Sequence, residues 1–305
     1  MNHVSKSGFA ALTAVLVSLS GCSRSDTSIL IDGSSTVYPI TEAVAEEFGK
    51  DRSDIRVVAG FSGTGGGMKK FINGEISICG ASRAIKDSEK QSCDEAGVEF
   101  IELEVAFDGL AVVLNPQNDW CDSLTVAQLK ELWRPESAVK KWSDLDPSWP
   151  EEEIKLYGPG TDSGTFDYFT KAIVGEEGAS RADYTRSEDD NVLVMGVQED
   201  RYAMGYFGYA YYAENKDKLK LLGVDQGDGP TQPTVETVRD GSYAPLSRPL
   251  YIYVRSSELQ RAEVKHFVRF YLDNAGKLAS DVGYVPISAD AEKKNEAAFG
   301  SALAG

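Results

Sequence analysis

Three stretches of the chain share one pattern, in which a short β run leads through a loop rich in Ser, Thr and Gly into a helix. The loops cover residues 32–39, 60–67 and 158–165. Strands that alternate with helices predict parallel βαβ units, and such sheets bind ligands beyond the carboxyl ends of their strands. The sequence therefore predicts an α/β fold in which the loops gather at one ligand site.

The loop at 158–165 shows what that ligand would be. Ser163 or Thr161 can cap the following helix, on which Phe166 and Phe169 recur at helical spacing. A helix start offers unpaired N–H groups and the positive end of the helix dipole. Hydroxyls add further donors, and glycines allow close approach, so the loop predicts a cradle for an oxyanion. A single loop of this kind fits an ordinary capped helix equally well, and the repetition favours the binding site.

The N-terminus has the pattern of an export signal. Lys6 precedes an apolar run at residues 8–19, and Leu-Ser-Gly-Cys follows, ending at Cys22. This pattern resembles that of bacterial lipoproteins, in which the cysteine becomes the lipidated first residue. We expect residues 1–21 to be a signal peptide, and residues 22–28 to be the lipidated cysteine and a polar tether. The protein would then be exported and anchored to a membrane of the cell envelope or periplasm. The alternative is a plain signal peptide with an incidental cysteine.

The charge of the chain limits its partners. The formal net charge is −17 at pH 7, which argues against nucleic acid as a partner. An anion can still bind, because the net field is screened within about 10 Å at 0.1 M salt while the donors touch the ligand. No stretch has the length of a mature transmembrane helix.

Three cysteines remain if Cys22 carries lipid. Cys79 lies in an apolar run, which predicts a buried core residue. Cys93 and Cys121 lie among polar residues, and export permits disulfides. We therefore favour a disulfide between Cys93 and Cys121.

The usual catalytic patterns are missing from the sequence. The histidines are His3, which leaves with the signal peptide, and His266, in a predicted helix. The sequence has no G-x-S-x-G elbow, no phosphate loop ending in G-K-[ST], and no zinc-type spacing of Cys and His. We therefore expect a protein that binds without catalysis, with no cofactor and no metal.

Four motifs together resemble the phosphate-binding proteins of bacterial phosphate ABC transporters. They are Asp-Gly-Ser-Ser-Thr-Val-Tyr-Pro at 32–39, Gly-Thr-Gly-Gly-Gly at 63–67, Gly-Ala-Ser-Arg at 80–83 and Asp-Ser-Gly-Thr-Phe at 162–166. The likeness extends over most of residues 29–290. It implies a type II periplasmic-binding-protein fold, in which two α/β lobes joined by a two-strand hinge close on dehydrated phosphate. Lobe I would comprise 29–107 and 250–305, and lobe II would comprise 108–249.

The resemblance also implies where the ligand and the hinge lie. It places hinge strands near 107–112 and 250–254. The residues themselves show extended runs at 100–107 and 110–114, and we expect a break between them at Asp108 and Gly109. The resemblance implies that phosphate is contacted by Thr36, Thr64, Ser163, Gly164 and Thr165. Neighbouring loop residues complete the candidate set: Ser34, Ser35, Gly65, Ser82, Arg83, Asp162 and Asp190.

One departure from the family concerns charge. Many relatives have aspartate where Arg83 stands, and arginine where Pro159 stands. Arg83 follows a predicted strand, and arginine suits oxyanions because it donates a fork of charged hydrogen bonds. We therefore predict that Arg83 replaces the lost arginine from the opposite lobe. The alternative is an arginine in a surface ion pair.

The lost aspartate leaves open how phosphate is told from sulfate. Phosphate near neutral pH still carries a proton, so a buried acceptor favours it over sulfate. We rank the candidates Asp162, Asp190 and Asp108, with Asp189 also present; each is alternatively a solvated or capping residue.

The sequence therefore predicts an exported, monomeric solute-binding lipoprotein that captures inorganic phosphate and delivers it to an ABC permease. The rival hypotheses are a binding protein for sulfate, molybdate or phosphonate, a phosphate sensor that reports to another protein, and an exported phosphohydrolase.

Overall fold

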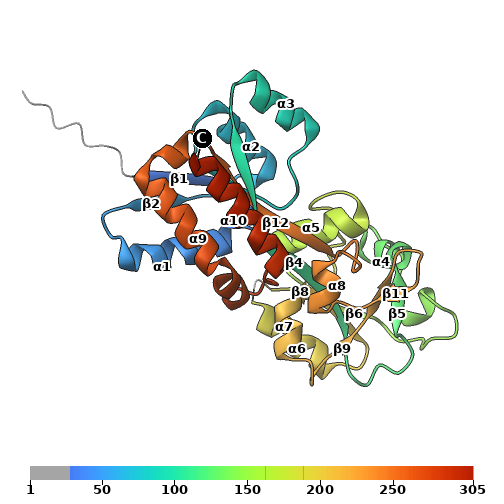
Figure 1. Cartoon of the computed structure of the whole chain (residues 1–305). Coiled ribbons are helices and arrows are strands. Elements are labelled where there is room, and N and C mark those ends of the chain that lie inside the picture. The colour runs from blue at the N-terminus through green and yellow to red at the C-terminus, as the bar shows by residue number, and fades with distance from the viewer. Residues whose placement is uncertain (1–27, 162, 188, 305) are drawn as a thin grey trace, which may run out of the picture.

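Two α/β lobes lie side by side in the computed structural model, which describes residues 28–161, 163–187 and 189–304 (Figure 1). The predicted signal peptide, Cys22 and Asp162 lie outside the described residues. The strands are β1 Ser28–Gly33, β2 Arg56–Ala59, β3 Ile78–Ala81, β4 Phe100–Leu114, β5 Ser123–Thr125, β6 Lys155–Gly158, β7 Thr185–Arg186, β8 Ala203–Gly208, β9 Lys220–Leu221, β10 Gly223–Asp225, β11 Pro230–Thr231 and β12 Ser247–Arg255. The helices are α1 Tyr38–Asp51, α2 Gly63–Asn73, α3 Asp87–Glu95, α4 Val126–Trp133, α5 Gly164–Phe169, α6 Asp190–Glu199, α7 Tyr209–Glu214, α8 Val235–Arg239, α9 Ala262–Asp281 and α10 Ala289–Ala304.

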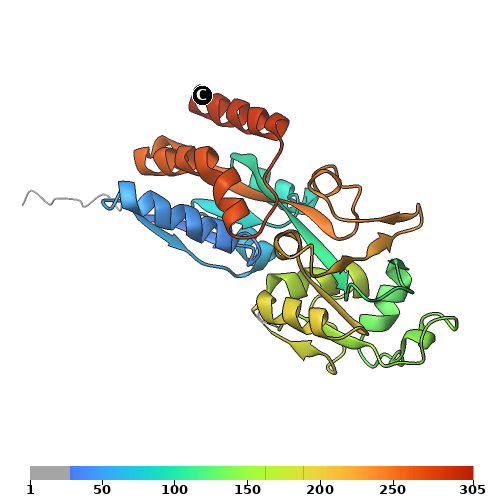
Figure 2. The ribbon, with the colours of Figure 1, turned by 90° about the horizontal axis from the view of Figure 1, so that it is seen from below.

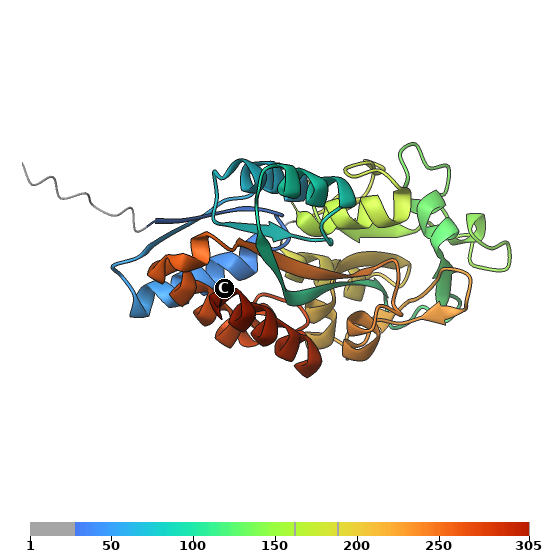
Figure 3. The same ribbon diagram turned by 45° about the horizontal axis from the view of Figure 1, so that its top comes forward.

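The main sheet runs through both lobes in the order β2-β1-β3-β12-β4-β8-β6-β7. In lobe I, β1 is parallel to β2 and β3, while β12 is antiparallel to β3 and β4. In lobe II, β6 is parallel to β8, which pairs antiparallel with the second half of β4. Strands β4 and β12 thus run through the junction between the lobes (Figure 3). The predicted two-lobe α/β fold is confirmed.

Strand β4 is longer than the sequence suggests. The predicted break at Asp108 and Gly109 is wrong, because β4 continues for 15 residues through both positions. The Asp108 carboxylate is paired with Arg248, its register partner on β12, so the charge does not end the strand. Gly109 is required by packing, since a Cβ there would lie 2.8 Å from Val238 on α8.

Each lobe has its own hydrophobic core. The lobe I core joins β1 and the first half of β4 to α1 and α9, and includes Ile29, Phe48 and Phe267. The lobe II core surrounds the second half of β4 and includes Trp133 and Tyr206. The two clusters share no residue, although the lobe II cluster also includes Val285 and Ile287 from the segment before α10.

The predicted disulfide is wrong. Cys93 and Cys121 are both free thiols, and they lie in hydrophobic clusters of different lobes. Cys93 is the buried residue of α3, so its polar sequence neighbours lie on the other side of that helix. Cys79 is buried as predicted, and burial raises the pKa of the Cys79 and Cys121 thiols to about 12.

The junction contains a β-bulge and a support from the C-terminus. The β4–β12 register shifts between Leu250 and Tyr251, so that Val105 has no partner on β12. The Asn295 side chain of α10 bonds both backbone groups of Glu104 beside the bulge, at 3.1 Å to its N and 2.7 Å to its O. Helix α10 therefore holds β4 where the strand bends, and it lies outside α9 on lobe I (Figure 2).

Within the described ranges, no helix is long and apolar enough to cross a membrane. The same residues contain no cluster of three or more His, Cys, Asp or Glu that could hold a metal ion.

Candidate functional site

The loop after β1 is locked against the end of β3. Ser34 N donates to Gly80 O at 2.9 Å. Gly33 has a φ of +145°, and a Cβ at that position would lie 2.0 Å from Gly80 O, so only glycine fits this close approach. The arrangement buries Ser34 and Thr36 at the carboxyl end of the lobe I sheet, with Ser35 between them.

The loop after β3 meets the start of α2. Thr64 Oγ1 accepts a hydrogen bond from Ser82 N at 3.3 Å and lies 3.3 Å from Ser82 Oγ. The first turn of α2 also packs against β1, since a Cβ on Gly67 would lie 2.5 Å from Gly33 Cα. Gly65 faces open space, with no atom within 4 Å of a Cβ built there. The segments that follow β1, β2 and β3 in lobe I therefore gather at one end of the sheet.

Lobe II contributes the start of α5. Ser163 is the cap, since its Oγ accepts from Thr165 N at 3.2 Å. A Cβ on Gly164 would lie 3.0 Å from Thr36 Oγ1 and 3.4 Å from Ser35 Oγ. The first turn of α5 thus meets the first loop of lobe I, and the structure brings together predicted site residues from both lobes.

Arg83 is engaged within lobe I. Its two terminal nitrogens donate to the two carboxylate oxygens of Glu89 at 2.8 Å each, and Nη1 also donates to Ala84 O at 3.1 Å. Hydrogen bonds from Arg83 are the largest cause of the lowered pKa of Glu89. The expected placement of Arg83 toward the opposite lobe is not what this structure shows, because Glu89 lies only six residues away and occupies the guanidinium. The ligand role of Arg83 stays a prediction.

Arg248 at the start of β12 is the arginine that lies at the junction. Its Nη2 donates to Thr36 Oγ1 at 2.8 Å, and its Nε and Nη2 donate to Asp108 Oδ2 at 3.1 and 3.0 Å. The guanidinium also stacks over the ring of Tyr168 on α5, 3.6 Å from its centroid. Arg248 therefore touches the first loop of lobe I, strand β4 and helix α5 of lobe II.

The four candidate acceptor acids differ in environment. Asp108 is buried, and its pKa is raised by burial, which the attraction of Arg248 only partly offsets. Asp189 is exposed and caps α6, where it accepts from Asn191 N at 3.0 Å. Asp190 is the first residue of that helix. Asp162 lies outside the described residues. The role of each acid in binding stays a prediction.

A model of the PBP superfamily domain matches residues 20–275. The chain belongs to the PBP superfamily. Among curated relatives, protein SphX of Synechocystis sp. is 47% identical over 96% of this chain and 88% of its own length. The phosphate-binding protein PstS of Staphylococcus saprophyticus is 45% identical over 84% of this chain and 79% of its own length.

A protein of known structure has the same overall arrangement. The crystal structure of a possible phosphate binding protein from Planctomyces limnophilus is 44% identical and superposes with a TM-score of 0.87. The match covers 90% of this chain and 98% of that one. The similarity therefore extends through both lobes.

Sequence reasoning missed Arg248, although a signal was present. The expected hinge strand at 250–254 begins only two residues after it, and β12 in fact starts at Ser247. Antiparallel pairing of the two expected hinge strands places Arg248 opposite Asp108. An arginine that precedes one hinge strand and faces an acid on the other is the pattern to look for.

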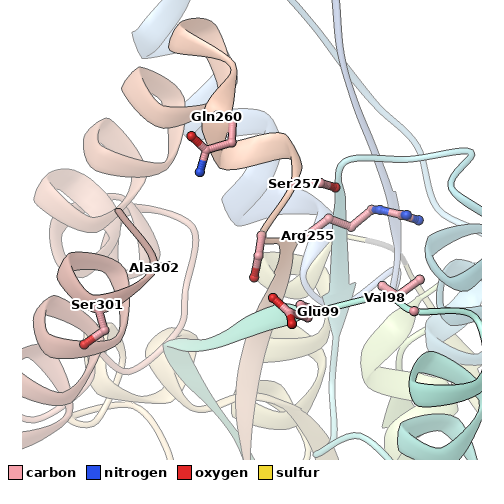
Figure 4. Close-up of a pocket in the computed structure, with 9 residues that line it drawn as sticks. Val98, Glu99, Arg255, Ser257, Gln260, Ser301 and Ala302 are labelled. Carbon is pink, nitrogen blue, oxygen red and sulfur yellow. The ribbon is translucent and has the colours of Figure 1, made fainter. Parts of the chain in front are cut away.

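A separate surface cavity of about 420 Å³ lies on lobe I beside the end of α10 (Figure 4). Its lining includes Glu99, Arg255 and Gln260, and none of the predicted site residues. Arg255 is engaged there, since its Nη1 donates to Phe71 O at 2.6 Å. The cavity is therefore distinct from the loops at the junction.

Proposed function

We propose that this protein is a solute-binding protein that captures inorganic phosphate between its lobes and delivers it to an ABC permease. One observation carries the proposal: Gly164, at the start of α5 on lobe II, lies against Ser35 and Thr36 on lobe I. The names of the relatives add support, since PstS of S. saprophyticus is called a phosphate-binding protein.

The chemistry of the junction suits a dehydrated oxyanion. Lobe I offers the hydroxyls of Thr36, Thr64 and Ser82, and lobe II offers the hydroxyl of Thr165 and the N–H groups of the first α5 turn. Hydrogen bonds to an anion are roughly twice as strong as neutral ones, so several neutral donors together can replace its water shell. We propose binding only, without a covalent step.

Calorimetric titration tests the ligand. Mature protein should bind phosphate and arsenate, which share a tetrahedral shape and a proton at neutral pH, and should bind sulfate and molybdate more weakly. Tighter binding of sulfate or molybdate than of phosphate would mean that the protein's ligand is that other oxyanion. A phosphatase assay on the same sample distinguishes a binding protein from an exported phosphohydrolase. Turnover of a phosphate ester would contradict pure binding.

We propose further that lobe I (29–107 and 250–305) and lobe II (108–249) close around phosphate. The bending would occur at β4 and β12. Only a closed form places donors of both lobes on one anion. Small-angle scattering should show a smaller radius of gyration with phosphate than without it. An unchanged radius would point to a rigid site.

The location of the protein is also a proposal. We propose that the protein is exported and stays on a membrane as a monomer through lipid on Cys22, because the sequence before that residue has the lipobox pattern. Cys22→Ala should move the protein to the soluble fraction of lysed cells. Unchanged membrane association would contradict the lipid anchor.

A further inference from the structure

We propose that Arg248 is the charged donor to the bound anion and that Asp108 and Tyr168 hold it in position. The inference rests on the proposed anion-binding function, and it assigns the charge to an arginine that lies on a junction strand.

The first argument is location. The Arg248 Nη2 donates to Thr36 Oγ1 at 2.8 Å. The same oxygen is 3.0 Å from where a Cβ of Gly164 would lie. A guanidinium bonded to this hydroxyl is therefore at the edge of the donors contributed by both lobes. An anion that replaces the Thr36 contact would need only a small movement of the side chain.

The second argument is the state of the guanidinium fork. Asp108 uses one carboxylate oxygen, Oδ2, to accept from Nε and Nη2 of Arg248. The Nη1 of Arg248 has no hydrogen-bond partner among the described residues, and the Arg248 side chain is 18% exposed. In Arg83, by contrast, both terminal nitrogens are taken by the two oxygens of Glu89. Arg248 thus keeps one terminal nitrogen, Nη1, for a ligand, whereas both terminal nitrogens of Arg83 are bonded to Glu89.

The third argument is rigidity. The Asp108 side chain is only 5% exposed and lies directly across from Arg248 in the antiparallel pair. The guanidinium is stacked on Tyr168, whose own hydroxyl donates to Pro245 O at 2.7 Å. A side chain held on two sides loses little further freedom when a ligand binds, which favours affinity. Asp108 and Tyr168 are therefore positioning residues.

The fourth argument is the lack of a competing cation on the same loops. Lys70 of α2 is bonded to Asp32 at 2.6 Å, and Arg83 is bonded to Glu89. Both pairs lie within lobe I. Among the cations in the described part of the chain, Arg248 alone is bonded to a hydroxyl of the candidate set.

The experiment compares phosphate affinity in single variants by calorimetry, with folding checked by circular dichroism and melting temperature. Arg248→Lys keeps the charge and loses the fork, and should weaken binding by about tenfold to several hundredfold. Arg248→Met should weaken binding at least as much. The matched control is Arg261→Lys, because Arg261 is paired with Glu258 and Glu263 on the far side of lobe I; it should change affinity less than about twofold.

Asp108→Asn tests the positioning role. Alone it should weaken phosphate binding by about tenfold, and in the Arg248→Lys background it should add little, because the residue acts through the fork. Losses that multiply in the double variant would assign Asp108 a general structural role and overturn this part of the inference.

The outcomes separate this inference from the proposed function. Wild-type protein that does not bind phosphate contradicts the function itself. Wild-type protein that binds phosphate, with folded Arg248→Lys binding equally well, overturns the inference alone. A loss in Arg83→Lys without a loss in Arg248→Lys would return the charged role to Arg83.

Discussion

Two arginine–carboxylate pairs in this protein differ in what they connect. Arg83 and Glu89 are six residues apart and lie wholly within lobe I, with their side chains 32% and 16% exposed. Arg248 and Asp108 are 140 residues apart on the two junction strands, with side chains 18% and 5% exposed. The first pair joins a loop to the helix that follows it. The second pair lies where the lobes meet and also contacts a loop of lobe I and a helix of lobe II.

The difference shows how far strand order alone can locate a ligand residue. Arg83 stands at the carboxyl end of a parallel strand, where ligand residues are expected. Its side chain nevertheless bonds Glu89 in the first turn of α3. The Glu89 carboxylate also accepts a hydrogen bond from Lys86 N, which holds it close to Arg83. A nearby acid at a helix start can therefore occupy the guanidinium of a candidate ligand arginine.

The largest expected difference between the pairs is in stability. Arg248→Met leaves the buried Asp108 carboxylate without its partner, and loss of one member of a buried pair typically costs about 3–5 kcal/mol. Arg83→Met should cost about 1 kcal/mol or less, since the pair is partly solvated. Urea unfolding at pH 7 without phosphate measures both. Equal losses in the two variants would mean that the pairs are energetically alike.

A smaller effect is expected at the contact between the lobes. Gly164→Ala adds a Cβ only 3.0 Å from Thr36 Oγ1, so the lobes cannot approach as closely. Overpacking of this kind costs about 1–3 kcal/mol, which corresponds to roughly 5- to 150-fold weaker phosphate binding.

Gly49→Ala is the control, because Gly49 lies in α1 outside the candidate set and a Cβ there has no neighbour within 4 Å. Its affinity should stay within about twofold, by the same absence of contact. Similar losses in both glycine variants would show that the contact between the lobes is not what limits binding.

The smallest effect concerns pH, and its sign differs between the two acids. The pKa of Glu89 is lowered, chiefly by hydrogen bonds from Arg83. Its contribution to stability is therefore present above the unfolded pKa of about 4.3 and is lost as the pH falls through the lower folded value. Glu89→Gln should be less stable than wild type at pH 7, and the gap in unfolding free energy should close toward pH 3.

Asp108 should show the opposite slope. Burial raises its pKa, so its contribution declines as the pH rises from about 3.9 through the raised folded value. Unfolding free energies of Asp108→Asn, measured across this pH range, should lack this decline.

For Glu89, the difference in unfolding free energy between wild type and Glu89→Gln should shrink on acidification. A difference that grows would contradict the assignment of the Arg83–Glu89 pair.

Local patterns were sufficient for the α/β class and for the loops, whereas the two-lobe arrangement came from the resemblance to a known family. Period and turn chemistry located β1, α1 and the Ser163 cap, and the repeated loops predicted their common end of the sheet. The bond from Arg248 to Thr36 joins residues 212 positions apart, and local patterns carry no record of such contacts. The cysteine error has the same cause, since Cys93 and Cys121 are buried by partners in separate lobes.

The position of β12 has a consequence for the order in which the protein can be assembled. In the sheet, β12 lies between β3 and β4, although 132 residues separate the end of β4 at Leu114 from its own first residue, Ser247. A chain that emerges from its N-terminus therefore has β1, β2 and β3 early and lacks the strand that joins them to β4. Lobe II is nearly contiguous in sequence and can fold first. Lobe I cannot be completed until β12, which begins about sixty residues before residue 305, is available. The early strands therefore keep an open edge until β12 is available, and under the proposed export this would link folding of lobe I to passage across the membrane.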